Sequence, residues 1–345
     1  MKTTTQQPDP SNIIQTGMGF WPSKVLLTAM NAGLFTMLAK QAQTVKQIKQ
    51  NLNWKCTDRH AMDFMDALHA LQFLKRKGSG DSAAYSNADD ADTFLDKDKP
   101  SYIGGILEMA NNRLFRFWAD LDEGLKTGKA QNESKRGEDL FEVIYSSPEK
   151  LKEFIHAMSG IQLGNFMSFA KTFDFSSYHS LCDIGGSGAM LSIQVALQQP
   201  HMQCISFDLP PVEPVAAETI ERFQLSDRVK TVSGDFFADD FPSADIIVMG
   251  NILHDWSEEK KQLLINKAYK ALPENGVLVV IENIIDEDRS QNVFGLMMSL
   301  NMLIETKEGF DFTLSDFEGW TQKAGFRSVD QLPLAGPTSA ALAYK

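Results

Sequence analysis

Cysteine is scarce in this chain of 345 residues: Cys56, Cys182 and Cys204 are the only three, and no two have C-x-x-C spacing. Cys182 and Cys204 lie in apolar, strand-like runs, which favours reduced core thiols over disulfides or zinc ligands. Long apolar runs are also lacking, since none approaches the roughly 18 residues of a membrane span. The opening stretch, MKTTTQQPDPSN, has no apolar segment typical of a secretory signal. We therefore expect a cytoplasmic protein without a metal ion or a membrane partner.

Positive charge is in short supply as well. Lys and Arg number 33 against 45 Asp and Glu, which gives a net charge of −12. Binding along nucleic-acid phosphates needs a positive surplus, so that class of partner is disfavoured. The rest of the composition, 43% hydrophobic and 23% charged, is typical of a globular protein. The length is sufficient for two domains.

The first third of the chain has helical patterns followed by a hairpin. SKVLLTAMNAGLFTMLAK (23–40) repeats apolar residues with the 3.6-residue period of a helix. Further helices are expected to start at the capping residues Thr44 and Asp58. A glycine-marked turn then leads to Tyr85 on a short return strand. Helices followed by a hairpin form a winged-helix pattern.

Winged-helix modules usually bind DNA, so a transcription regulator has to be considered. Residues 44–108 contain nine Lys or Arg and ten Asp or Glu. A recognition helix in a DNA groove requires a positive surplus, and this segment has none. The charge balance favours a helical module for packing or dimerisation. We place this domain at residues 1–105.

From residue 179 onward, short apolar runs alternate with helical patterns. The runs are SLCDI, QCISFD, VKTVSG, ADIIVMG and GVLVVIE. Such alternation predicts a doubly wound, Rossmann-like α/β domain with a mostly parallel sheet. The end of the chain, FRSVDQLPLAGPTSAALAYK, predicts an antiparallel hairpin at the edge of that sheet. This second domain is expected to span 106–345, with a helical lead-in over 106–178 and the core over 179–345.

Polar residues follow three successive strands of the predicted sheet. Asp183 precedes the turn GGSG, where Gly185 and Gly186 would let a ligand approach the backbone closely. Asp208 ends the next strand, where a carboxylate can accept both hydroxyls of a ribose. Asp235 and Phe236 follow the third strand, placed to bind and stack an adenine. Because the carboxyl ends of parallel strands meet at one edge, these residues together predict a nucleoside site.

The ordered series DIGGSGA, FDLPPV, GDFF, LHDWSEE, VVIENIIDED and SLNMLI resembles the S-adenosylmethionine-dependent O-methyltransferases. The similar members are the plant caffeate-type enzymes, the bacterial polyketide O-methyltransferases and, closest in layout, acetylserotonin O-methyltransferase. The resemblance covers nearly the whole chain. It implies S-adenosylmethionine as cofactor, S-adenosylhomocysteine as product and an N-terminal winged-helix domain that forms a homodimer. Family dimers exchange N-terminal segments, so Phe20 and Trp21 are expected to reach the partner subunit.

The resemblance assigns the general base to His254, which lies just beyond the fourth strand. A phenol has a pKa of about 10 and is mostly protonated at neutral pH. A neutral imidazole can remove its proton during methyl transfer. The family's flanking acids fall on Glu282, at the end of the fifth strand, and on Asp311. Asp311 stands where the family has glutamate and is one methylene shorter. Asp255 and Trp256 are interpreted as a helix cap and a packing aromatic.

Two features of the cofactor site depart from the family pattern. Its glycine-rich turn usually reads D-x-G-G-G-x-G, whereas Ser187 and Ala189 occupy the last two glycine positions here. A positive φ at Ala189 would strain the turn. The family commonly has Lys or Arg at the position of Gly250. By the same resemblance, Leu209 and Tyr145 complete the cofactor set.

The resemblance forms the acceptor pocket from the middle helices and the stretch before LNMLI. Met and Phe walls suit a flat aromatic guest. The same residues at helical spacing also fit an ordinary core, and Asn301 stands out as a polar group in an apolar segment. The candidates are Trp118, Met158, Gln162, Phe166, Met298, Asn301 and Met302.

Three functions remain open at this point. The favoured one is O-methylation of a phenolic hydroxyl on a small aromatic metabolite. A relative that methylates nitrogen or carbon, or that uses the sulfonium in non-methylating chemistry, would share every motif above. A winged-helix regulator with a cofactor-sensing domain is the third, and the charge balance disfavours it.

Overall fold

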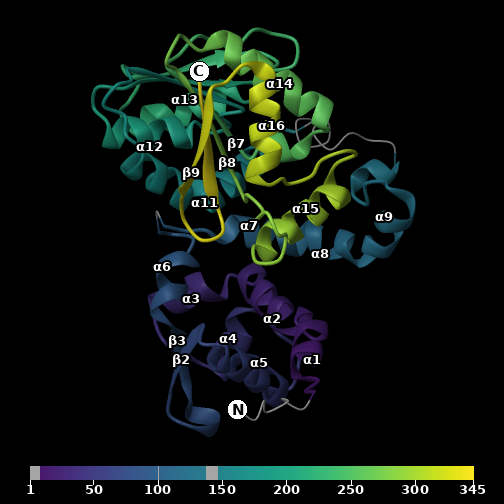
Figure 1. Cartoon of the computed structure of the whole chain (residues 1–345). Coiled ribbons are helices and arrows are strands. Elements are labelled where there is room, and N and C mark those ends of the chain that lie inside the picture. The colour runs from purple at the N-terminus through teal and green to yellow at the C-terminus, as the bar shows by residue number, and fades with distance from the viewer. Residues whose placement is uncertain (1–7, 100, 137–146) are drawn as a thin grey trace, which may run out of the picture. The chain divides into compact units, whose positions relative to one another are not determined.

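The computed structural model describes residues 8–99, 101–136 and 147–345 (Figure 1). The chain divides into two compact units, one running to Leu114 and the other from Phe115 to Lys345. The boundary expected at 105/106 stays a prediction. Each unit has its own hydrophobic core.

The N-terminal unit is helical with a small antiparallel sheet. Strand β3 lies between β1 and β2, and its Tyr85 side chain is fully buried. The two-helix-plus-hairpin arrangement of α4, α5, β2 and β3 agrees with the winged-helix pattern. The elements are α1 (Ser11–Gly17), α2 (Phe20–Asn31), α3 (Leu34–Lys40), β1 (Gln43–Thr44), α4 (Val45–Asn51), α5 (Asp58–Ala70), β2 (Leu74–Lys77), β3 (Ala84–Asn87), α6 (Asp89–Phe94) and α7 (Gly104–Met109).

Local capping explains where these helices begin. Thr44 caps α4 in a capping box with Gln47, as expected from the sequence. Helix α5 is capped by Thr57, whose hydroxyl accepts the His60 N–H at 3.2 Å, so the expected cap at Asp58 is one residue too late. The helical pattern over 23–40 forms two helices, because the chain turns at Ala32 and Gly33.

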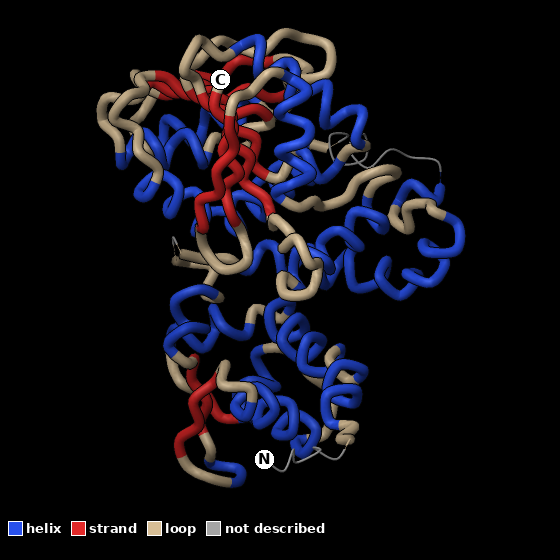
Figure 2. Tube along the Cα trace, viewed as in Figure 1, coloured by secondary structure: helices blue, strands red, loops and turns tan. Residues whose placement is uncertain are grey.

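The C-terminal unit is built on a seven-stranded sheet in the order β6-β5-β4-β7-β8-β10-β9. The strands are drawn in red in Figure 2. The first five strands in that order pair in parallel, and β10 pairs antiparallel with both β8 and β9. The expected mostly parallel sheet with a C-terminal hairpin is therefore confirmed. The strands are β4 (Ser180–Ile184), β5 (Gln203–Asp208), β6 (Val229–Ser233), β7 (Ile246–Gly250), β8 (Val277–Glu282), β9 (Ser328–Pro333) and β10 (Ser339–Tyr344).

Helices cover both faces of this sheet, which is why its central strands are continuously apolar. In β8, Val277, Val279 and Ile281 pack into the core with α11, α12 and α13. The alternate residues Leu278 and Val280 pack into the opposite core with α14 and α16. The helices are α8 (Phe115–Phe117), α9 (Leu121–Thr127), α11 (Pro148–Thr172), α12 (Met190–Gln198), α13 (Glu213–Arg222), α14 (Glu258–Ala271), α15 (Val293–Glu305) and α16 (Leu314–Ala324).

The cysteines and the helix lengths bear on two further expectations. Cys182 in β4 and Cys204 in β5 are buried free thiols, and Cys56 is an exposed one. Among the described residues, no helix combines the length and the apolar character that crossing a bilayer requires. The cytoplasmic location stays a prediction.

Helix α16 offers two glycines with opposite expected responses to an added methyl group. At Gly319, inside the helix, a Cβ would meet no described atom within 4 Å. Gly325, at the C-cap, has φ of +107°, and a Cβ there would lie 3.0 Å from Tyr269 Cζ. We expect Gly319→Ala to raise the free energy of unfolding by about 0.5–1 kcal/mol. Gly325→Ala should lower it by at least about 1 kcal/mol.

Urea denaturation of the two variants beside the parent protein measures both changes. Because the substitutions add the same methyl group to the same helix, each is the control for the other. Equal effects of the two variants would contradict the assigned backbone conformations.

Candidate active site

His254 is held at the carboxyl end of β7 by the register of the parallel strands. Gly250 of β7 lies opposite Ile281 of β8, so the two strands end side by side. The Asn251 N–H donates to the Ile281 carbonyl at 3.0 Å and extends this pairing by one residue. A single 3-10 turn (Leu253–Asp255) follows, and it places His254 next to Glu282, the last residue of β8. Both side chains are buried.

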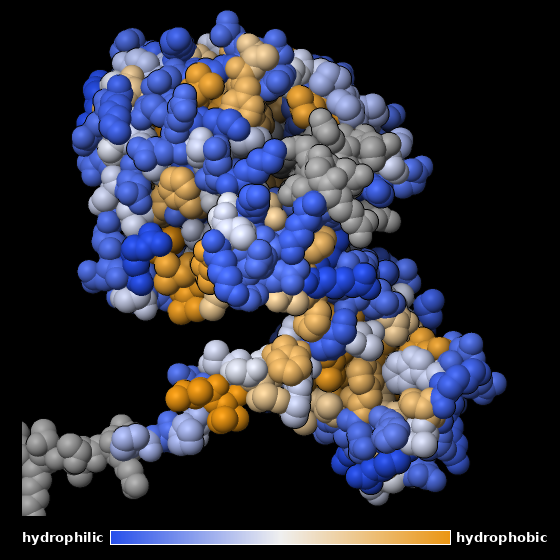
Figure 3. All heavy atoms as spheres, turned by 90° about the vertical axis from the view of Figure 1, so that its right-hand side faces the viewer, coloured by the Kyte–Doolittle hydropathy of each residue, from blue (hydrophilic) through white to orange (hydrophobic). Residues whose placement is uncertain are grey.

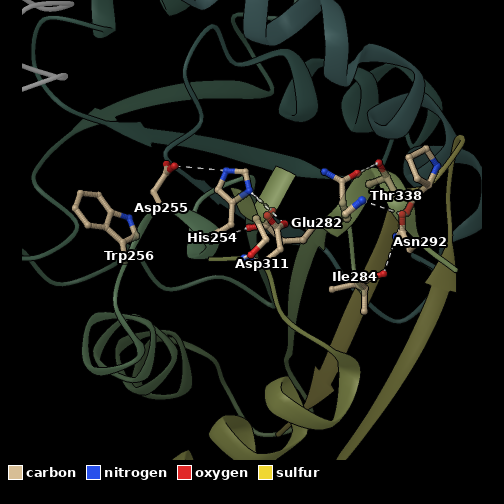
Figure 4. A network of polar contacts seen from close by, with 12 residues as sticks. His254, Asp255, Trp256, Glu282, Ile284, Asn292, Asp311 and Thr338 are labelled. Carbon is tan, nitrogen blue, oxygen red and sulfur yellow. Dashed lines mark hydrogen bonds and ion pairs between the residues drawn. The ribbon is translucent and has the colours of Figure 1, made fainter. Parts of the chain in front are cut away.

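The His254 imidazole lies among three carboxylates (Figure 4). Nδ1 is 3.1 Å from Glu282 Oε2 and 3.6 Å from Asp311 Oδ1. Nε2 is 3.5 Å from Asp255 Oδ1. The His254 backbone N–H also donates to Glu282 Oε1 at 3.3 Å, so that one carboxylate fixes both the ring and the turn that carries it.

Asp311 approaches from a loop that leads into α16. Its backbone N–H donates to Ser299 Oγ of α15 at 3.2 Å. The next residue, Phe312, accepts the Ile285 N–H at 2.9 Å, which ties this loop to the segment after β8. These contacts bring the shorter aspartate side chain within ion-pair distance of Nδ1 despite the missing methylene.

Asp255 is the site residue whose position the sequence interpretation missed. It was expected to cap α14, but α14 begins at Glu258 and Ser257 occupies the N-cap position. The 3-10 turn instead directs the Asp255 carboxylate toward Nε2 of its neighbour. An acid directly after the candidate base was the available signal. Trp256 packs against the Phe236 and Phe237 rings, in keeping with its interpretation as a packing aromatic.

Burial and charge act in opposite directions on the His254 imidazole. Burial by itself lowers the pKa of His254, but the carboxylates of Glu282, Asp255 and Asp311 outweigh it and raise that pKa to about 10. Burial raises the pKa of Glu282, and the nearby imidazole lowers it in part. The surrounding carboxylates therefore favour the form of the His254 ring that carries both protons.

A buried lysine lies behind this cluster. Lys261 is fully buried, its Nζ donates to the Trp256 carbonyl at 2.5 Å, and it lies 3.4 Å from the centre of the Phe310 ring. Burial lowers the pKa of Lys261 to about 8, although the neighbouring acids Glu282 and Asp311 favour its charged form. Its ammonium supplies a positive charge close to the carboxylates.

The glycine-rich turn after β4 is anchored on β5. The N–H groups of Gly185 and Gly186 both donate to the Phe207 carbonyl, at 2.8 and 3.2 Å. A Cβ at Gly186 would lie 2.3 Å from Ser206 Oγ, so a side chain does not fit there. Ser187 and Ala189 have φ of +51° and +59°. The strain expected from replacing glycine at Ala189 is therefore present.

The predicted nucleoside residues gather around this turn. Asp208 Oδ2 accepts the Ser187 N–H at 2.8 Å, and Oδ1 accepts the Leu209 N–H at 2.7 Å. Asp183 is buried below the turn, and burial raises the pKa of its carboxyl group well above the usual value. The buried hydroxyl of Ser206 has no hydrogen-bond partner among the described residues.

The adenine candidates lie on the loop after β6. The Phe236 ring packs beside the turn, 4.0 Å from where a Cβ of Gly185 would be. Asp235 is half-buried, and its Oδ1 accepts the Phe237 N–H at 2.8 Å. Gly250, at the end of β7, lies under the Phe166 ring, which a Cβ would approach to 3.5 Å. Tyr145 lies outside the described residues.

Three of the predicted acceptor residues are held by hydrogen bonds. Trp118 Nε1 donates to Asn301 Oδ1 at 2.8 Å and joins the chain after α8 to α15. Gln162 of α11 is buried and accepts an N–H from Asn165 at 2.8 Å. The apolar candidates Met158 and Met298 are half-buried and Met302 is buried, which is also compatible with core packing. The structure leaves the acceptor roles as predictions.

One group of described residues has the spacing of metal ligands. His254, Glu282 and Asp311 each offer a ligand atom within 4.8 Å of the others. Nδ1 of the imidazole lies at ion-pair distances from the two carboxylates, which is the arrangement of a buried ion-paired cluster. The expectation that the site works without a metal stays a prediction.

Comparison with known proteins identifies similar chains along the whole length. A family model for the O-methyltransferase domain matches residues 118–327, and one for the O-methyltransferase dimerisation domain matches residues 14–97. The tetracenomycin polyketide synthesis 8-O-methyl transferase TcmO of Streptomyces glaucescens is 34% identical over 100% of this chain and 99% of its own. The N,N-dimethyltransferase OxyT of Streptomyces rimosus is 29% identical over 95% of this chain and 94% of its own.

A solved structure agrees with these sequence matches. The crystal structure of human N-acetylserotonin methyltransferase in complex with S-adenosylmethionine superposes with a TM-score of 0.89. It is 27% identical and covers 100% of this chain and 99% of its own.

The three-carboxylate environment of His254 makes its pKa sensitive to the loss of one acid. We expect Glu282→Gln to lower the pKa of His254, because it removes the carboxylate 3.1 Å from Nδ1 that contributes the largest charge effect. Titration of the His254 ring signals by NMR measures the change. His60, an exposed histidine on α5, supplies reference signals in the same spectra. An unchanged His254 titration would contradict the assigned ion pair.

Proposed function

Since this chain belongs to the O-methyltransferase family, we propose that it transfers a methyl group from S-adenosylmethionine to a phenolic hydroxyl of a small aromatic molecule, with His254 as the general base. The observation that carries this proposal is the buried imidazole among Glu282, Asp311 and Asp255, at the strand ends beside the glycine-rich turn. The ligands of open α/β sheets bind at that edge.

The residues around the turn have the chemistry that the cofactor requires. A nucleoside needs a carboxylate for its ribose hydroxyls, close backbone approach and an apolar surface for its base, and Asp208, Gly186 and Phe236 supply these in turn. The unpaired buried hydroxyl of Ser206 is a further polar group at this position. When bound, S-adenosylmethionine provides an electrophilic methyl group on a sulfonium sulfur.

His254 would control the proton of the acceptor hydroxyl. Nδ1 faces Glu282 and Asp311, which leaves Nε2, beside Asp255, as the nitrogen for proton transfer. The carboxylates hold the ring in place and stabilise its protonated form after transfer. A pKa of about 10 for His254 matches that of a phenol, about 10, so transfer between them has little energetic bias.

This pKa also sets a direction for the pH dependence. In the reactive complex, the imidazole and the phenol together have lost one proton relative to their fully protonated state. Below about pH 10 this singly deprotonated complex becomes more abundant as pH rises. The rate at limiting acceptor should therefore increase toward alkaline pH.

The other two functions explain fewer of the observations. The relative OxyT is an N,N-dimethyltransferase, so an amine acceptor is the second candidate. The match of residues 118–327 to the O-methyltransferase domain and the 34% identity to TcmO favour oxygen as the nucleophile. A DNA-binding regulator receives no support, because residues 14–97 match a dimerisation domain and residues 44–108 contain nine Lys or Arg against ten Asp or Glu.

The N-terminal unit supports a homodimer. Its first two helices expose apolar side chains, Ile13 at 72%, Ile14 at 62%, Phe20 at 52% and Trp21 at 60% (Figure 3). Such side chains gain from burial against another surface. We propose that Phe20 and Trp21 insert into the partner subunit, which the dimerisation-domain match supports.

Removing the imidazole tests the base. We expect His254→Ala to lower turnover of a phenolic acceptor by roughly 10²–10⁴-fold, while affinity for S-adenosylhomocysteine changes by no more than a few-fold. Labelled methyl transfer measures turnover and calorimetry measures affinity. His60→Ala removes an exposed histidine and should match the parent protein in both assays. Parent-like turnover in His254→Ala would end the general-base assignment.

Removing the ribose carboxylate should have the opposite pattern. We expect Asp208→Ala to weaken S-adenosylhomocysteine binding by about tenfold or more, because the two charge-assisted hydrogen bonds from the ribose hydroxyls to the carboxylate would be lost. Asp227→Ala, an exposed aspartate in the loop before β6, is the matched control. Calorimetry on thermally stable samples decides, and unchanged affinity in Asp208→Ala would show that the nucleoside lies elsewhere.

A further inference from the structure

The loop that carries the adenine candidates is closed by its own aspartates. Asp235 Oδ1 accepts the Phe237 N–H at 2.8 Å, and Asp239 Oδ2 accepts the Asp235 N–H at 2.8 Å. The Asp235 carbonyl accepts the N–H groups of Ala238 and Asp239, at 3.0 and 2.7 Å. These bonds fold residues 235–239 into one compact turn, which we call the 235–239 turn.

Three carbonyl oxygens of the 235–239 turn lie around a single cation. Lys267 Nζ, on α14, donates to the Phe236 and Phe237 carbonyls at 2.7 and 3.2 Å. It also donates to the Asp239 carbonyl. An ammonium group has three N–H donors, so each of the three carbonyls can receive one. The same Nζ lies 5.1 Å from the centre of the Phe241 ring.

The 235–239 turn is held on its backbone and on its rings. The ammonium of Lys267 is half-buried, and its charge makes the bonds to the carbonyls stronger than bonds from a neutral donor. The Phe236 and Phe237 rings lie edge-on to the Trp256 indole, with 6.0 and 4.7 Å between ring centres. Lys267 therefore attaches the backbone of the turn to α14, while Trp256 packs against its side chains.

The position of Phe236 matters for the cofactor. Its Cε1 lies 4.0 Å from where a Cβ of Gly185 would be, beside the glycine-rich turn. Lys267 binds the carbonyl of Phe236 itself, so it fixes the backbone from which this ring projects. A ring that is in place before binding does not have to be ordered by the ligand, and this raises affinity.

We propose that Lys267 is a positioning residue for the cofactor, because its ammonium holds the 235–239 turn in the form in which Asp235 and Phe236 bind the adenine of S-adenosylmethionine. This inference rests on the proposed nucleoside site and adds a residue that acts through the backbone of that site. Without the ammonium, the turn has to be ordered during binding, which costs affinity. The proton-transfer step depends instead on His254 and its carboxylates.

Removing the ammonium tests the proposal. We expect Lys267→Met to weaken S-adenosylhomocysteine binding by about tenfold, measured by calorimetry, because the turn loses its attachment to α14. Lys270→Met makes the same substitution at an exposed position of α14 and should bind like the parent protein. Should Lys267→Met fail to fold, Lys267→Gln loses the charge but keeps two N–H donors, and it should weaken binding by about threefold or more.

Steady-state kinetics separates positioning from a general loosening of the fold. In Lys267→Met, the KM for S-adenosylmethionine should rise by a larger factor than kcat falls, and the KM for the acceptor should stay within about twofold of the parent value. A merely structural role would lower kcat and raise both KM values together. That result would overturn the positioning role.

The Asp208→Ala variant separates this inference from the site on which it rests. If Asp208→Ala weakens S-adenosylhomocysteine binding and Lys267→Met does not, the nucleoside site stands and the role of Lys267 is overturned. Unchanged affinity in both variants overturns the site and the role together. Weaker binding in Lys267→Met, without methyl transfer to any phenol, upholds the role and overturns the proposed reaction. Equally weak binding in Lys270→Met would also overturn the role of Lys267, since any lost charge on α14 would then suffice.

Discussion

The candidate active site depends on the parallel pairing of β7 and β8. Because Gly250 and Ile281 are in register, the residues that follow these strands emerge together, and His254 meets Glu282 without any long loop to position it. The Glu282 carboxylate contacts both the ring and the backbone N–H of His254. Burial makes the cluster costly unless the charges are paired, and the approach of Asp311 and Asp255 completes the pairing.

The sequence predicted the features that follow from short-range patterns. The alternating apolar runs led to the sheet and its hairpin. His254 and Glu282 stood out as polar residues at the ends of buried strands, and the family resemblance assigned their roles. The role of Asp255 was predicted wrongly, because the sequence HDW fits an aspartate that caps a helix as well as one that contacts the histidine ring. What separates them is the 3-10 turn, which depends on how Asn251 pairs with β8. The sequence did not reveal that residues 23–40 contribute to two helices, because the apolar period continues through the turn that separates them.

The glycine-rich turn combines strain with anchoring. Two non-glycine residues, Ser187 and Ala189, adopt left-handed backbone conformations within three positions. Such conformations persist where the surroundings impose them. Here the Phe207 carbonyl and the Asp208 carboxylate bind successive N–H groups of the turn.

The order of the strands also distinguishes the residues that the centre of the sheet holds in place from residues on the surrounding helices, which tolerate substitution better. Strands β7 and β8 lie inside the sheet, whereas its edges are β6 and β9. Local opening begins at edges, so we expect the amides inside β7 and β8 to exchange hydrogen more slowly than those of β6 and β9. Most of the predicted acceptor residues lie on α11 and α15, outside the sheet. Substitutions on those helices can therefore accumulate without changing the strand pairing that brings His254 next to Glu282.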